Sequence, residues 1–118
     1  LVKKDFFAQA RLDREAGRSK AIETFNTVID NDESDEQVKL SAQEQVLDIA
    51  KNTEAEVAIE NLIKAKGFED AVCYISGKKC NIVVKSTGLS QSDVAKIMDI
   101  AMENTSLPAE NIKIVEIE

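Results

Sequence analysis

The side chains nearest to a catalytic arrangement are Ser76, Lys78 and Lys79, which lie close together along the chain. A serine or cysteine nucleophile would need a lysine or a carboxylate to activate it, held in a pocket. This trio falls on an expected hairpin tip, and the chain has no histidine, the usual base at neutral pH. The sequence therefore disfavours catalysis and predicts no cofactor.

An acidic run suggests calcium chemistry at first sight. Asp30, Asp32 and Ser34 fall at the first, third and fifth places of an EF-hand loop. Asp35 stands where that loop needs glycine, and Ser41 stands where it needs a bidentate glutamate. The run is therefore interpreted as a solvated turn between helices, and no metal site is expected.

Two cysteines, Cys73 and Cys80, flank the expected hairpin turn, and without histidine they make a poor metal site. With Gly77-Lys78 as the turn they are diagonal neighbours, near the upper distance limit for a disulfide. A slipped turn at Ser76-Gly77 would place them directly opposite. Two buried thiols are favoured, and the disulfide remains open.

The composition excludes several classes of function. The net charge is -7, from 15 basic and 22 acidic residues, which disfavours binding to a nucleic acid. No Gly-x-x-Gly loop of the kind used by KH domains occurs. No apolar run approaches the ~20 residues that a membrane-spanning helix needs. The chain begins at Leu1 without a methionine, so we expect an excised piece of a longer protein.

Apolar spacing predicts long helices in the first half of the 118 residues. The first runs from Lys4 to about Asn31. A second begins after a Ser34 cap with Gln37 completing a capping box, and a third runs from about Glu54 to Lys66, with Gly67 as the left-handed residue after its end. Whether the second and third are one continuous helix is open. We expect an N-terminal helical region at 1–52 and a compact unit at 53–118.

In the second half the apolar period changes to two. Strands are predicted at 71–76 and 79–85, a helix capped by Ser90 through about Asn104, and a last strand at 111–117. The resulting αββαβ unit is an α+β, two-layer α/β fold with helices on one face of a three-stranded sheet.

Positions that satisfy the helical and strand periods together form the predicted core, and truncating Leu62 to alanine is expected to cost ~2–5 kcal/mol. The core list is Ile59, Leu62, Ile63, Ile75, Ile82, Val84, Val94, Ile97, Met98, Ile112 and Ile114, and Cys73 and Cys80 share the core face of the hairpin. Val115 and Ile117 either face away from this core or are turned inward by a bulge.

The segment Glu60-Asn61-Leu62-Ile63-Lys64-Ala65-Lys66-Gly67-Phe68-Glu69-Asp70-Ala71-Val72 resembles the extracytoplasmic domain of the stage III sporulation protein AH family. So do Ala10-Arg11-Leu12-Asp13-Arg14-Glu15 and Arg18-Ser19-Lys20. In that family the αββαβ unit is a ring-building motif, similar to motifs in flagellar basal-body rings and type III secretion inner rings.

The resemblance implies a non-enzymatic structural subunit of a channel or secretion-like complex in sporulation. Its domain would be anchored in the mother-cell membrane by a segment before Leu1 and would face the space between mother cell and forespore. There it would bind a forespore protein like stage II sporulation protein Q, which carries a LytM-type domain, and possible self-association would build a ring. The rival interpretation is a generic secretion-system or adaptor domain of the same fold. Without its anchor the domain is expected to be a monomer or weak oligomer.

A partner site follows if the strands form a split βαβ arrangement with the first strand central. The second strand would then be an edge, open to strand addition and flanked by lysines that steer an incoming chain. The predicted partner-binding residues are Gly77, Lys78, Lys79, Asn81, Val83 and Lys85.

Overall fold

The computed structural model describes residues 2–118, with side chains from Phe6 onward. Two long helices come first, and a ββαβ unit follows them. The elements are α1 (Val2–Asp30), α2 (Glu36–Ala65), β1 (Ala71–Ser76), β2 (Lys79–Lys85), α3 (Gln91–Thr105), a short 3-10 turn (Ala109–Asn111) and β3 (Ile112–Ile117).

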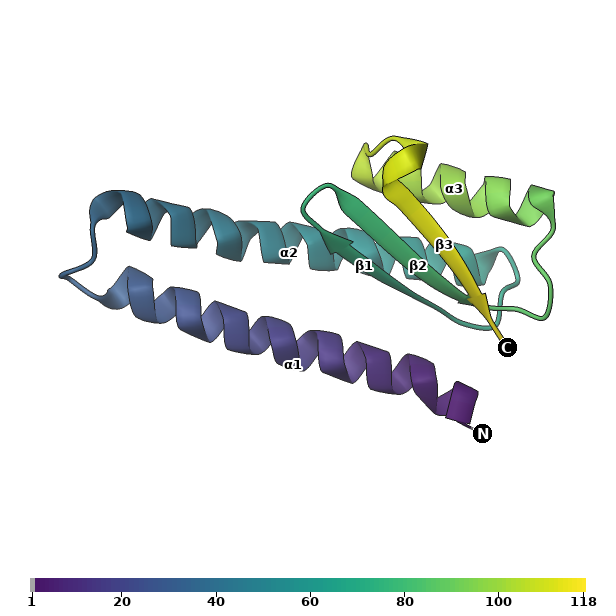
Figure 1. The fold of residues 1–118 in the computed structure, drawn as a ribbon, viewed down its shortest axis with the longest axis horizontal. Coiled ribbons are helices and arrows are strands. Elements are labelled where there is room, and N and C mark those ends of the chain that lie inside the picture. The colour runs from purple at the N-terminus through teal and green to yellow at the C-terminus, as the bar shows by residue number, and fades with distance from the viewer. Residues whose placement is uncertain (1) are drawn as a thin grey trace.

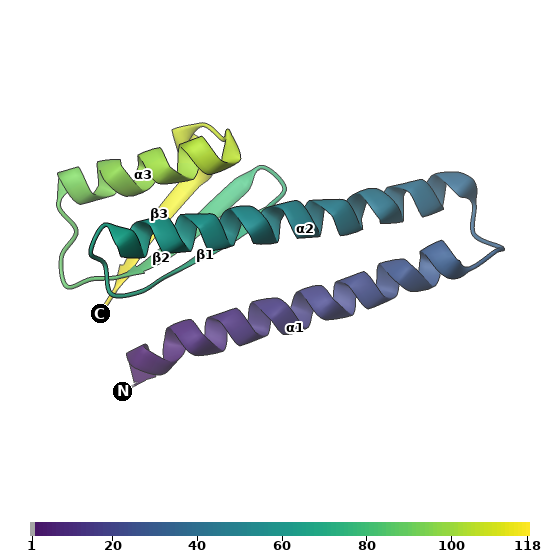
Figure 2. The same ribbon diagram turned by 180° about the vertical axis from the view of Figure 1, so that it is seen from behind.

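The sheet lies against the second half of α2, and α2 and α3 cover one of its faces (Figures 1 and 2). Helix α1 runs back alongside α2, and the two helices project well beyond the sheet (Figure 1). This projection explains the elongated extents of 54 × 33 × 20 Å. The αββαβ unit is therefore confirmed, with α1 as a long addition to it.

The predicted second and third helices are a single helix, α2, which runs without a break through residues 52 and 53. The division into regions 1–52 and 53–118 remains a prediction. The predicted Ser34 cap is wrong, because α2 begins one residue later with Asp35 at the cap position and no side-chain cap bond. The tight turn before it is stabilised instead by Asn31, whose Oδ1 accepts the Glu33 N–H at 3.0 Å.

The end of α2 and the start of α3 follow the predicted signals. Gly67 has φ +105°, the left-handed region that glycine enters without a Cβ clash, and Phe68 packs against the core. At the start of α3, Ser90 and Asp93 form a reciprocal capping box. These local signals place the turns that orient the sheet against α2 and α3.

The hairpin register is confirmed. Cys73 pairs with Ile82 and Ile75 pairs with Cys80 across a turn in which Gly77 has φ +59°. The five predicted core-face side chains of the hairpin are all buried, in one cluster with Ile59, Ile63, Ile97 and Ile112. Met98 and Ile114 are partly buried against the same cluster.

Two predicted core residues are wrong: Leu62 is 44% exposed and Val94 is 36% exposed. Helices α2 and α3 lie side by side over only three strands. The sheet therefore covers a narrower row of residues on each helix than the apolar residues of that helix occupy. In α2 that stripe passes through Ile59 and Ile63, one helical turn apart. In α3 it includes Ile100, which was not predicted.

The predicted strand order is also wrong. The order is β1-β2-β3, with β2 central, β1–β2 antiparallel and β2–β3 parallel. The β2–α3–β3 segment is a crossover between adjacent parallel strands, and a 15-residue helix is long enough to make it. The two edges are therefore β1 and β3.

The first turns of α1 cover part of the sheet face opposite α2. Phe7 and Ala10 pack there against Val72, with Val83 and Ile117 partly buried around them. Ile117 therefore does face away from the main core, as a regular strand requires, and Val115 on the same face is exposed. The two helices of the αββαβ unit, α2 and α3, lie on one face of the sheet as predicted, and the contact on the other face comes from α1, outside that unit.

Cys73 and Cys80 are fully buried free thiols with their Sγ atoms 3.6 Å apart. The hydrogen bond between the two thiols and burial raise the pKa of Cys73. We expect iodoacetamide to label both thiols at least ~100-fold more slowly in the native protein than in denaturant, because neither side chain is exposed to solvent and the reagent reaches them only when the chain opens. Mass spectrometry of the alkylated chain measures this, and rapid native labelling would contradict the burial.

Candidate partner-binding site

The outer edge of β1 is closed by two buried glutamates of α2, Glu56 and Glu60, and three partly buried arginines of α1, Arg11, Arg14 and Arg18. We name these five residues the Arg–Glu ladder. The arginines lie three and four residues apart and the glutamates four apart, so each set occupies one face of its helix. The two faces meet along β1, beside which α1 runs (Figure 1). The ladder is therefore built by helix periodicity.

The ladder satisfies the backbone of β1 in the way a neighbouring strand would. Glu60 Oε2 accepts the Cys73 N–H at 2.8 Å, and Glu56 Oε2 accepts the Ile75 N–H at 2.6 Å. Arg14 Nη1 donates to the Cys73 carbonyl at 2.6 Å and to Glu60 Oε2 at 2.7 Å. The carbonyl of Cys73 and its N–H are thus both used.

The two ends of the ladder complete the seal. Arg11 Nη2 donates to the Ala71 carbonyl at 2.7 Å and to the Asp70 carboxylate. Arg18 forms a bidentate pair with Glu56, with Nη2 to Oε2 at 2.6 Å. No further chain can pair with β1 while these bonds are in place.

The charges of the ladder reinforce one another. Burial alone lowers the pKa of Arg14, but the hydrogen bond to Glu60 and the charges of Glu60 and Glu56 outweigh it and raise that pKa. For Asp70 burial raises the pKa, and the hydrogen bonds from Arg11 and from the Ala71 N–H outweigh it and lower that pKa. Both groups therefore stay ionised at neutral pH, and the seal on β1 is electrostatic as well as geometric.

The predicted partner-binding residues are divided by the structure. Val83 is partly buried beneath α1, and Lys85 pairs with the Glu69 carboxylate. Gly77, Lys78 and Lys79 are exposed at the hairpin turn, and Asn81 is exposed on β2. The premise of an open β2 edge is wrong, because β2 pairs on both sides. The role of these residues in partner binding remains a prediction.

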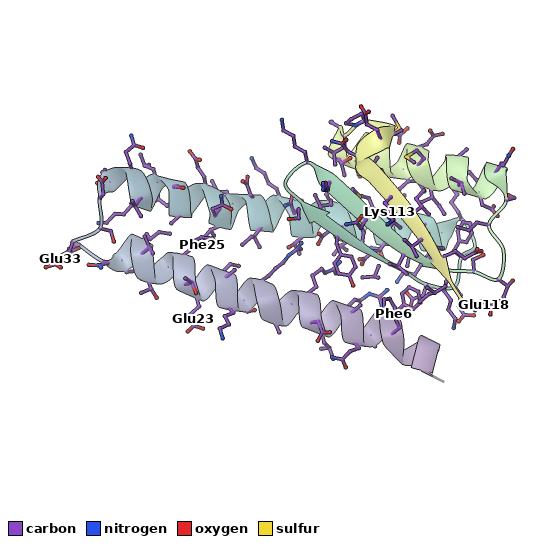
Figure 3. All side chains as sticks on the ribbon, in the orientation of Figure 1. Phe6, Glu23, Phe25, Glu33, Lys113 and Glu118 are labelled. Carbon is purple, nitrogen blue, oxygen red and sulfur yellow. The ribbon has the colours of Figure 1, made fainter. Side chains whose placement is uncertain are left out.

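The exposed members of that set line an open groove of about 560 Å³ between the hairpin and the start of β3, which we name the lysine groove. Its lining residues are Ser76, Lys78, Lys79, Asn81, Glu110, Asn111, Ile112 and Lys113. Figure 3 shows Lys113 near the start of β3, toward the hairpin turn, and Glu118 at the other end of that strand. None of the residues that line the groove is among the sheet residues that pack with α1, which are Val72, Tyr74, Val83 and Ile117.

Comparison with known proteins shows the family of the chain. The family model described as "SpoIIIAH-like protein" matches residues 2–114. The chain belongs to the SpoIIIAH-like family. The resemblance to the stage III sporulation protein AH family that the sequence predicted is therefore confirmed.

Stage III sporulation protein AH of Bacillus subtilis (strain 168) is 35% identical over 96 residues, which cover 81% of this chain and 44% of that protein. The chain thus spans less than half the length of this curated relative. In the solved structure of the SpoIIQ-SpoIIIAH pore forming complex, a matching chain is 32% identical with a TM-score of 0.86. That match covers 95% of this chain and 96% of the solved one, so the two share the fold almost throughout.

Sequence reasoning missed the Arg–Glu ladder, although its signals were present. Arg11, Arg14 and Arg18 were part of the family resemblance, but no role was assigned to them. Their common helix face, together with the Glu56–Glu60 spacing of four residues, was the available sign. Only the packing of α1 against β1 shows that these charges satisfy strand backbone groups.

Proposed function

We propose that the chain is a non-enzymatic structural subunit of a sporulation complex, and that it binds a SpoIIQ-like protein of the forespore membrane. The observation that carries this proposal is the fold match over 95% of the chain, at 32% identity, to a protein solved in the SpoIIQ-SpoIIIAH pore forming complex. A fold shared at this identity brings equivalent surfaces into equivalent places, so a related partner is the economical assignment.

The chemistry of the described residues supports a binding role. The two thiols are buried, and Lys78 and Lys79 lie at an open turn rather than in a closed pocket. Among residues 2–118, no group of three metal-ligating side chains is arranged to hold an ion.

The proposed placement is at the boundary between mother cell and forespore, with the domain outside the mother-cell cytoplasm and anchored in the mother-cell membrane. Within residues 2–118 no helix is long and apolar enough to cross a membrane. In this proposal the complex forms a channel between the two cells, and a rigid elongated subunit suits a wall built from repeated contacts.

The test is direct binding to the purified extracellular domain of the SpoIIQ-like protein from the same organism. We expect co-elution on size-exclusion chromatography and a saturable isotherm in titration calorimetry. A LytM-type domain from an enzyme unrelated to sporulation is the control and should not bind. If no binding were detected with the SpoIIQ-like domain in ~100-fold molar excess over this chain, the proposal would be refuted.

A further inference from the structure

One sheet edge is closed and the other is open. The ladder uses the outward N–H groups of Cys73 and Ile75 and the outward carbonyls of Ala71 and Cys73. Strand β3 pairs with β2 on one side only and forms the outer margin of the sheet (Figure 1). An added strand can therefore be accepted at β3 but not at β1.

The bonds of β1 also show which backbone groups of β3 are available. Residues 71, 73 and 75 direct their N–H and C=O groups away from β2, so by alternation residues 80, 82 and 84 of β2 direct theirs toward β3. In a parallel pair only one residue of each matched couple points at the other strand. Ile114 and Glu116, matched to Ile82 and Val84, therefore point their N–H groups to the open edge.

The lysine groove adjoins this edge and carries the opposite charge to the rest of the chain. Lys78, Lys79 and Lys113 line it with a single acid, Glu110, whereas the whole chain has a net charge of -7. No ion pair among the described residues involves these three lysines. Val115, exposed beside Lys113 on the same sheet face, adds an apolar contact. An acidic segment is the complementary occupant.

We propose that the β3 edge and the lysine groove form one docking surface, which accepts an extended acidic segment of the SpoIIQ-like partner as an added strand. The inference rests on the proposed function and names the surface of this chain that binds the partner. Backbone bonds to Ile114 and Glu116 fix the register, and carboxylates of the added segment meet the lysines. The surface is formed in the free domain, so binding needs no rearrangement of the sheet.

The first test reverses the groove charges in the triple variant Lys78→Glu, Lys79→Glu, Lys113→Glu. Affinity for the SpoIIQ-like domain should fall about 30- to 100-fold, mainly through slower association. The matched control reverses the exposed helix lysines Lys20, Lys51 and Lys96 and changes the net charge equally; it should alter affinity less than ~3-fold. Equal losses in the two triples would overturn the inference.

The second test uses the unchanged chain and amide hydrogen exchange by NMR. Binding should slow exchange of the Ile114 and Glu116 N–H groups at least ~10-fold, while Cys73 and Ile75 stay as they are because the ladder already bonds them. Protection confined to Leu40 and Leu47, which are exposed on α2, would place the partner on the helices. That result would overturn this inference and leave the proposed function standing. No binding of the unchanged chain would overturn the proposed function and this inference together.

Discussion

Replacing Glu56 with alanine is expected to lower the free energy of unfolding by ~3–5 kcal/mol, the cost of breaking a buried ion pair from one side. Glu56 is completely buried, and its carboxylate is shared by Arg18, by Arg14 at 3.5 Å and by the Ile75 N–H. The alanine variant leaves the partly buried guanidinium of Arg18 without its carboxylate partner and the Ile75 N–H without its acceptor. One substitution therefore removes both an ion pair and a hydrogen bond to the backbone, and each loss lowers the free energy of unfolding.

The matched control is Glu54→Ala, which removes the same side chain from an exposed position two residues away on the same helix. It should change the free energy of unfolding by less than ~0.5 kcal/mol. Urea unfolding followed by circular dichroism measures both variants, with equal m-values required for the comparison. A loss below ~1 kcal/mol in the Glu56 variant would mean that water replaces the carboxylate and that the ladder does not hold β1.

Short-range signals in the sequence predicted much of this fold. The Gly77-Lys78 turn fixed the hairpin register, since a two-residue loop leaves only one pairing for Cys73 and Ile75. The Ser90–Asp93 box and Gly67 marked helix ends correctly. Each of these features depends on residues within a few positions of one another, where chain geometry permits few alternatives.

Long-range features were not predictable in the same way. The αββαβ pattern is compatible with either β1 or β2 at the centre, and only the packed crossover decides between them. The ladder joins α1 to α2 across nearly forty residues, from Arg18 to Glu56. The spacing of the charges along each helix is readable in the sequence, but the return of α1 along β1, which gives that spacing its meaning, is not.

Some of the predicted partner-binding residues do lie on an open surface, but the strand order from which they were predicted is wrong. Lys78, Lys79 and Asn81 do line an open groove, because hairpin turns are exposed in any topology. The open β2 edge was an error of strand order, and it also brought in Val83 and Lys85, which α1 and Glu69 engage. A correct strand order moves the available backbone to β3 and leaves the lysines beside it.

The adjacent residues Ile63 and Leu62 should respond to truncation very differently. Ile63→Ala is expected to lower the free energy of unfolding by ~2–5 kcal/mol, because this fully buried side chain packs between α2 and the sheet. Leu62→Ala should cost less than ~1 kcal/mol, since the side chain is 44% exposed. Both variants place alanine, a good helix former, in the same helix, so helix propensity differs little between them.

This pair of variants therefore tests which face of α2 packs against the sheet. A helix rotates ~100° per residue, so a rotation of α2 by one position would bring Leu62 to where Ile63 now packs and would turn Ile63 away from the sheet. Thermal and urea unfolding of both variants measure the difference, and the ladder provides an independent check because Glu56 and Glu60 lie on the same helix. If Leu62→Ala proved the costlier change, α2 would present a different face to β1, and neither glutamate would reach the backbone N–H groups that the ladder satisfies.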